Sequence, residues 1–162
     1  MVYGNLFSES NNQEENSEIS IMESLDIIQE YKAAKLPAEL KIDEEDIINA
    51  SRFKSKIQKI IKFLEDNNYT EKQISKTVSG FYYAIVGTTF YSSKQTDKYQ
   101  PKIAWLATYI NKYCIEKNKN RIKTDIERTI VTLDKRSEKE GGLSDFLKAY
   151  YTDIKNALSK LK

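Results

Sequence analysis

The 162-residue sequence contains no histidine, one cysteine, five glycines and two prolines. Without histidine, the chain lacks the Ser-His-Asp and Cys-His arrangements of nucleophilic catalysis, the commonest general base and the commonest zinc ligand. The single cysteine, Cys114, can form no internal disulfide and has no CxxC partner with which to hold a metal. Glycine and proline are too few for a β-rich chain, which turns about every ten residues, so the composition favours helices.

Other signatures of chemistry are also missing. No GxxxxGK[ST] or GxGxxG stretch could cradle a nucleotide phosphate, and the acidic residues form no compelling catalytic pair. We therefore expect a protein that is not an enzyme, with no cofactor, metal or small-molecule substrate. No apolar run of about 18 residues occurs, and the N-terminus lacks the pattern of a secretory signal, so we expect a cytoplasmic protein without membrane contact.

Charge is divided unevenly along the chain. Residues 1–50 contain 12 acidic and 3 basic side chains, whereas residues 51–162 contain 12 acidic and 23 basic ones, which gives net charges of −9 and +11. Such asymmetry indicates a polyanionic partner for the basic part, with an acidic part that solubilises it, contacts a protein neighbour or shields the basic surface. The alternative is an acidic disordered tail attached to a lysine-rich domain.

The length suits one domain with a substantial core. Residues 1–42 are interpreted as an acidic, partly disordered N-terminal arm, in which residues 1–16 are disordered and residues 17–35 form a possible short helix. Residues 43–162 are interpreted as a basic α-helical domain. Its boundary is placed at Asp43, which is a good N-cap for the first helix of the domain.

About five amphipathic helices are predicted between residues 43 and 162, so the expected fold is an all-α, single-domain bundle. Thr70 and Gln73 have the spacing of a capping box at the start of the second helix, and Pro101 suits the first turn of the third. The residues expected to face the core on the first three helices are Ile47, Ala50, Phe53, Ile57, Ile60, Ile61, Leu64, Ile74, Val78, Phe81, Ile85, Ile103, Leu106, Ala107, Ile110 and Cys114. On the last two they are Ile122, Ile126, Ile130, Leu133, Phe146, Leu147, Tyr150, Ile154, Ala157, Leu158 and Leu161.

Basic residues recur at helical spacing on the outer faces of three predicted helices. The rows are Arg52, Lys56 and Lys59 on the first, Arg121, Arg128 and Lys135 on the fourth, and Lys148, Lys155 and Lys162 on the last. Such rows can follow a phosphate backbone, with salt-dependent affinity and no sequence preference. The alternative is that lysine fills the solvated face of a soluble helix.

The second predicted helix has a strip of small residues on one side. The strip consists of Gly80, Ala84 and Gly87, flanked by Tyr82 and Tyr83, with Lys76 one turn before it. Glycine weakens a helix by about 1 kcal/mol relative to alanine, so two glycines in one helix indicate that something packs closely there. Another helix is favoured over an RNA backbone as that neighbour.

The third predicted helix has a second face opposite its apolar one. Lys102, Trp105, Tyr109 and Lys112 lie on it, about 100–180° from Ile103 at 100° per residue. Aromatic rings can stack on bases while ammonium groups meet phosphates, so these four residues and Lys76 are predicted to bind RNA. A second helix that packs on Trp105 and Tyr109 explains the aromatic residues equally well.

Three stretches resemble the small subunit of Csm-type (type III-A-like) CRISPR effector complexes. PKIAWLAT, residues 101–108, is similar to the signature helix of that family; ISKTVSGFYYAIV, residues 74–86, resembles its earlier helix; LSDFLKAYYTDIKNALSK, residues 143–160, resembles its last helix. The family usually has an arginine where Ser79 stands and a Gly-Arg pair where Thr108 and Tyr109 stand, so Lys102 is the basic residue that matches its motif. A Cmr-type small subunit is the nearest rival.

The resemblance implies a non-catalytic, all-α subunit that repeats along a ribonucleoprotein beside the duplex of guide RNA and target RNA. Its partners would be these RNAs, further copies of itself and other subunits of the effector complex. The alternative function is a protein-binding helical adaptor, in which the acidic arm and an aromatic face recruit a partner without any nucleic-acid contact.

Overall fold

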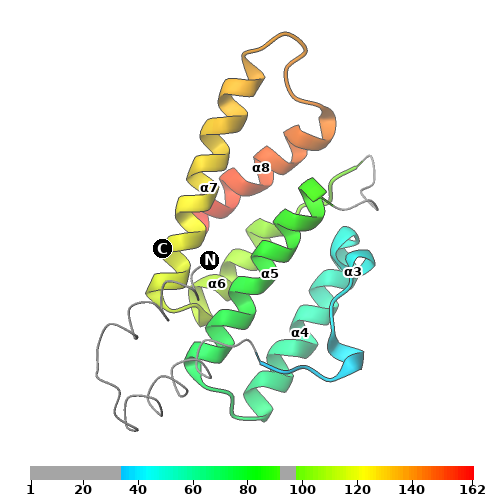
Figure 1. Ribbon diagram of the computed structural model, residues 1–162, viewed down its shortest axis with the longest axis vertical. Helices are drawn as coiled ribbons and strands as arrows, with labels where there is room; N and C mark the ends of the chain where they lie inside the picture. The colour runs from blue at the N-terminus through cyan, green and yellow to red at the C-terminus, as the bar shows by residue number, and fades with distance from the viewer. Residues whose placement is uncertain (1–33, 92–97) are drawn as a thin grey trace, which may run out of the picture. The chain divides into compact units, whose positions relative to one another are not determined.

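The computed structural model describes residues 34–91 and 98–162, which are all-helical (Figure 1). Its elements are the short 3-10 helix η1 (Ala38–Leu40) and the α-helices α3 (Glu44–Ile48), α4 (Ala50–Asp66), α5 (Glu71–Tyr91), α6 (Ile103–Tyr113), α7 (Glu116–Ser137) and α8 (Asp145–Lys160). The predicted all-α class is thus confirmed for these two ranges. The predicted helix at residues 17–35 lies outside the described residues except for Ala34 and Lys35, which are not helical.

The first predicted helix of the domain is divided into α3 and α4 at Asn49. Asp43 begins α3 as expected: its carboxylate accepts the backbone N–H of Asp46 at 2.8 Å, and the Asp46 carboxylate accepts the N–H of Asp43 at 3.2 Å. Asn49 leaves the helical conformation, with φ −109° and ψ 108°, and its side chain accepts the N–H of Arg52 at 3.0 Å. Because this amide caps the new helix, the chain can turn between α3 and α4.

Helix α5 begins with the predicted capping box. The Thr70 hydroxyl accepts the N–H of Gln73, and the Gln73 side chain accepts the N–H of Thr70, both at 3.1 Å. Asn68, in the turn before it, has a φ of 53°, a left-handed conformation that asparagine tolerates better than most residues. The turn and the cap together fix where α4 ends and α5 starts.

Helices α7 and α8 form a hairpin (Figure 1). The turn contains Gly141 and Gly142 with φ values of 89° and 58°, which glycine adopts without a side-chain clash. Ser144 then caps α8, since its hydroxyl accepts the N–H of Leu147 at 3.2 Å. Helix α7 therefore ends at Ser137, shortly before this glycine pair.

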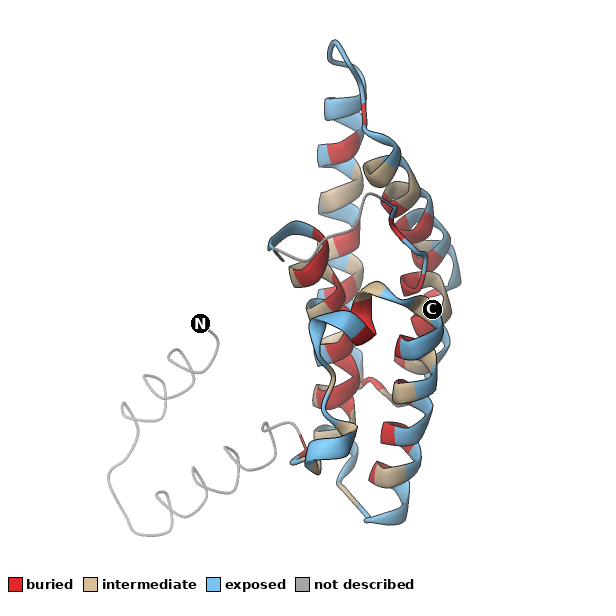
Figure 2. Cartoon of the chain, turned by 90° about the vertical axis from the view of Figure 1, so that its right-hand side faces the viewer, coloured by how far each residue is buried: buried red, intermediate tan, exposed pale blue. Residues whose placement is uncertain are grey.

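The core lies between the inward faces of the helices, where buried residues gather while the outer faces are exposed (Figure 2). Helix α6 packs on α5 and α8, α7 packs on the same two helices, and α3 packs on α4 and α5. The predicted inward face of the third helix is confirmed, because Ile103, Leu106, Ala107, Ile110 and Cys114 are all buried. None of the helices in the described ranges combines the length and apolarity that crossing a membrane requires.

Residues 34–42, which the sequence assigns to the acidic arm, pack on the bundle. The buried backbone N–H of Ala34 donates to the Thr77 hydroxyl at 3.0 Å, and the Tyr69 hydroxyl donates to the Lys35 carbonyl at 3.2 Å. Leu40 and Ile42 are half-buried against the core. Among the described residues, packing on the bundle therefore already includes Ala34, nine residues before Asp43.

Candidate nucleic-acid-binding surface

The start of α6 is held by a carboxylate from α8. One oxygen of Asp153 accepts the backbone N–H groups of Lys102 and Ile103 at 3.0 and 2.9 Å, and the other accepts that of Ala104 at 2.9 Å. The Tyr99 hydroxyl donates to the same carboxylate at 2.5 Å. Helix α6 has no side-chain cap from its own N-cap residue, so the buried Asp153 satisfies the N–H groups that a helix start leaves unpaired.

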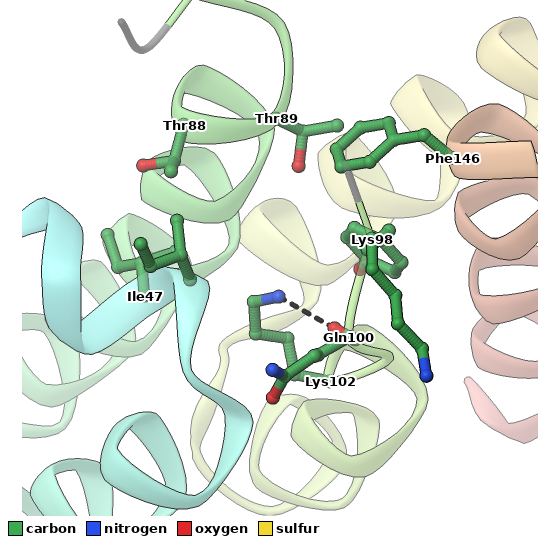
Figure 3. Close-up of a pocket in the computed structure, with 9 residues that line it drawn as sticks. Ile47, Thr88, Thr89, Lys98, Gln100, Lys102 and Phe146 are labelled. Atoms are coloured by element: carbon green, nitrogen blue, oxygen red, sulfur yellow. Dashed lines mark hydrogen bonds between the residues drawn. The ribbon is translucent and has the colours of Figure 1, made fainter. Parts of the chain in front are cut away.

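Lys102 belongs to this buried cluster, and its predicted place on an RNA-binding face is wrong. Only 3% of the residue is exposed; its ammonium donates to the Gln100 carbonyl at 2.7 Å (Figure 3) and lies 4.4 Å from the centre of the Tyr99 ring. Lys102 is the N-cap of α6 with φ −153°, so the helical wheel that placed it beside Trp105 does not apply. Burial lowers the pKa of Lys102 to about 8, against the opposing effect of Asp153.

A small cavity of about 20 Å³ adjoins Lys102 (Figure 3). Its walls come from α3, from the end of α5, from the segment before α6 and from Phe146 of α8. This volume holds about one water molecule, so the cavity suits a structural water rather than an organic ligand.

Trp105 joins α6 to α4, and Tyr109 packs beside it on α6. The Trp105 ring meets Phe53 of α4 edge-on at 6.4 Å, and the Lys54 ammonium lies 5.7 Å from the Trp105 ring. Tyr109 contacts Trp105 at 4.8 Å and stacks on Tyr113 at 6.2 Å with an interplanar angle of 11°. Both residues are half-buried. The alternative explanation of the aromatic residues, that another helix packs against the second face of this helix, is therefore the arrangement observed.

Lys112 is exposed at the end of the same row of rings. Its ammonium lies 5.2 Å from the Tyr113 ring, and the Tyr113 hydroxyl donates to Glu65 of α4 at 3.0 Å. Of the four residues predicted to form one face, Lys112 is therefore the cation on the surface, Trp105 and Tyr109 serve packing, and Lys102 is buried.

The basic row of α4 is partly neutralised. Arg52 and Lys56 lie 2.9 and 3.4 Å from the Asp46 carboxylate, and Lys56 also donates to the Lys41 carbonyl at 3.2 Å. Burial alone would raise the pKa of Asp46, but the N–H of Asp43 and the cations of Arg52 and Lys56 hold it below its usual value. Lys59 is exposed and forms no ion pair with a described residue. Of the three cations in this row, only Lys59 is therefore without an ion pair among the described residues.

The basic row of α7 has a different setting. Arg121 and Arg128 are exposed, and neither forms an ion pair within residues 34–91 and 98–162. They line an open depression of about 560 Å³ between α7 and α5; its lining residues are Tyr83, Lys117, Asn120, Arg121, Thr124, Asp125 and Arg128. We call these seven residues the α5–α7 depression. It contains three cationic side chains and one carboxylate.

The small-residue strip of α5 adjoins the α5–α7 depression, because Gly80 and Gly87 lie one turn on either side of Tyr83. A Cβ added at Gly80 or at Gly87 would meet no atom within 4 Å. The prediction that another helix packs closely on this strip is therefore wrong for the described part of the chain. Lys76, also predicted to bind RNA, is half-buried one turn before Gly80.

The sequence predicted two residues of the depression, Arg121 and Arg128, as members of a row, but it did not link them to Tyr83. Lys117 was missed, although it precedes Arg121 by four residues and so lies on the same edge of the helix. Asn120 and Thr124 had no signal of their own, because polar residues are common on any solvated helix face.

Within residues 34–91 and 98–162, no group of three or more cysteine or acidic side chains could hold a metal ion. Comparisons with models of protein families, with curated proteins and with solved structures find no match to this chain.

Proposed function

We propose that this protein is a non-catalytic small subunit of a type III CRISPR ribonucleoprotein effector complex, which binds along the guide RNA and target RNA. The observation that carries the RNA-binding part is the pair Arg121 and Arg128, exposed and unpaired among the described residues beside the partly exposed Tyr83. Assignment to the complex rests on the resemblance of residues 74–86, 101–108 and 143–160 to Csm-type small subunits. A Cmr-type small subunit is the rival within the same class.

The arrangement of charge supports a polyanionic ligand. Lys117, Arg121, Arg128 and Lys135 follow one edge of α7 over 18 residues, or about 27 Å of helix axis. Cations spaced along a line match the spaced charges of a phosphate backbone, and each phosphate contact releases counterions and adds salt-dependent affinity. This edge replaces the α6 residues Lys102, Trp105 and Tyr109 as the centre of the expected RNA contact, since those three serve the fold.

Neutralising the two arginines tests this proposal. We expect Arg121→Gln with Arg128→Gln to weaken binding of single-stranded RNA by about 10- to 100-fold at about 0.1 M salt and to reduce the slope of log affinity against log salt by about 1.4. The matched control is Lys59→Gln with Lys148→Gln, which removes two exposed charges from α4 and α8 and should change affinity by less than about threefold. Equal losses in both double variants would show that only net charge matters.

Membership of the complex needs a separate readout. The tagged full-length chain, expressed from its native locus, should co-purify with guide RNA and with the other subunits of a type III effector. RNA binding in solution without such co-purification would leave a general RNA-binding protein and refute the assignment to the complex.

A second candidate function, a protein-binding adaptor, is favoured by the exposed aromatic end of α5, where Phe90 is 41% and Tyr91 is 85% exposed. Deletion of residues 1–33, which contain seven acidic and one basic side chain, separates the two functions. The RNA proposal predicts equal or tighter RNA binding after deletion, because net negative charge is removed. The adaptor proposal, which relies on the acidic arm, predicts loss of a protein partner.

A further inference from the structure

The aromatic ring in the α5–α7 depression is held from behind. Tyr83 is 38% exposed, and its ring meets the fully buried ring of Tyr82 edge-on at 5.0 Å and 79°. The Tyr82 hydroxyl in turn donates to Asp125 of α7 at 2.5 Å. Tyr83 therefore has a fixed neighbour on its inner side and an accessible surface toward the depression, as a stacking platform requires.

Cations lie beside this ring. Arg121 lines the depression together with Tyr83. Burial raises the pKa of the Tyr83 phenol and the Asp125 carboxylate adds to the increase, whereas the Arg121 guanidinium acts in the opposite direction. Arg128 follows two turns later, at about 10 Å along the helix axis. A ligand on Tyr83 can thus reach two guanidinium groups without passing outside the depression.

The space matches a ligand of nucleotide size. The depression measures about 560 Å³, within the range of about 300–1,000 Å³ that is usual for small-molecule sites. Access is open on the α5 side, since no atom lies within 4 Å of a Cβ built at Gly80 or Gly87. The carboxylate of Asp125 repels phosphate, so a nucleotide fits best with its base on Tyr83 and its phosphates toward the arginines.

We propose that the α5–α7 depression binds an unstacked nucleotide of single-stranded RNA, with the base stacked on Tyr83 and the adjoining phosphates on Arg121 and Arg128. The inference rests on the proposed RNA-binding function and adds to it a preference for single-stranded over double-stranded RNA. In a duplex the bases are stacked on one another and cannot leave the helix without losing those contacts, so the platform favours single strands.

The test measures the affinity of the full chain, by fluorescence anisotropy, for a labelled 12-nucleotide RNA of mixed sequence and for the corresponding duplex. Tyr83→Leu should weaken single-strand binding by about 5- to 100-fold and leave duplex binding within about twofold. Tyr83→Phe keeps the ring and should bind both RNAs as the unaltered protein does. Circular dichroism melting of each variant checks that the fold is intact.

The possible results of this test distinguish the stacking inference from the proposed RNA-binding function. Unchanged single-strand affinity in Tyr83→Leu, or equal loss for both RNAs, overturns the stacking inference while the proposed RNA-binding function stands. Failure of the unaltered protein to bind either RNA overturns both. Ultraviolet cross-linking of a 4-thiouridine strand should modify the segment that contains Tyr83, and a cross-link found only on α6 or α8 would contradict the site.

Discussion

Two tyrosine–aspartate pairs of this protein have the same hydrogen-bond length and different surroundings. The hydroxyls of Tyr99 and Tyr82 each donate at 2.5 Å, to Asp153 and Asp125 respectively. Asp153 is 1% exposed and accepts three backbone N–H groups as well, whereas Asp125 lines an open depression with exposed arginines nearby. The first pair stabilises the start of α6, whereas the second lies beneath the surface of the α5–α7 depression.

The comparison distinguishes polar side chains that stabilise the fold from polar side chains of the same types that are available to a ligand. Around Asp153, Lys102, which was predicted to bind RNA, and Tyr99 are both buried, and their polar atoms are used inside the protein. Around Asp125, the Tyr82 hydroxyl is used, whereas Arg121 and Arg128 form no ion pair with a described residue and remain available to a ligand. A binding site is therefore indicated by polar groups that the fold leaves uncommitted rather than by the residue types themselves.

Asp153→Ala should produce the largest loss of stability. The change leaves three backbone N–H groups at the start of α6 and the Tyr99 hydroxyl without their acceptor in a buried place. Each unsatisfied buried donor costs about 1–3 kcal/mol with partial relief by water, so we expect a loss of about 3–5 kcal/mol in the free energy of unfolding, measured with urea. Asp153→Asn keeps one acceptor oxygen and should lose less. A loss below about 1 kcal/mol in Asp153→Ala would contradict this account.

Trp105→Ala tests the seam between α4 and α6. Removal of the half-buried indole takes away its edge contact with Phe53 and its contact with Tyr109, so we expect a loss of about 2–3 kcal/mol in the free energy of unfolding. RNA affinity of the folded variant should stay within about twofold. Weaker RNA binding with unchanged stability would move the binding surface back to α6, as the sequence first suggested. Trp105→Phe, which retains a ring, is the control.

The sequence predicted most of the helices because their apolar residues recur with helical spacing and their caps are local. Asp43 was predicted as an N-cap and Thr70 with Gln73 as a capping box, and both caps are present; the partner of Asp43 in a second box, Asp46, was not predicted. The division at Asn49 was missed because an apolar pattern that continues through a cap gives no signal of the bend.

Hydrogen bonds in which a side chain of one helix caps the start of another could not be predicted from the sequence alone. Asp153 is 49–51 residues from the N–H groups that it accepts, and the Ser75 hydroxyl accepts the N–H of Ile115 across 40 residues. The burial of Lys102 followed from the first of these caps and so could not be foreseen. Arg121 and Arg128 were predicted because they share one helix, whereas Tyr83 belongs to another helix and required the packing of α5 on α7.

Lys102→Met tests the burial of that lysine through pH. The pKa of Lys102 is about 8 in the native protein and near 10.5 when unfolded, so the unfolded chain binds more protons between these values and stability rises with pH. Methionine has no proton to release. We expect the stability of the unaltered protein relative to the variant to increase by about 1–2 kcal/mol between pH 7.5 and 9.5. All other titratable groups are common to both chains, so their contributions cancel in this difference. A constant difference across this range would mean that Lys102 is solvated.

Gly80→Ala and Gly87→Ala should give the smallest effects, with the opposite sign. A methyl group at either position meets no atom within 4 Å, so the change lowers the conformational entropy of the unfolded chain without a clash, and each variant should be about 0.5–1 kcal/mol more stable in thermal unfolding. Neither glycine lines the α5–α7 depression, so single-strand RNA affinity should stay within about twofold. Weaker RNA binding in a more stable variant would place the RNA strand on the glycine face of α5, because only an external ligand could meet the added methyl group.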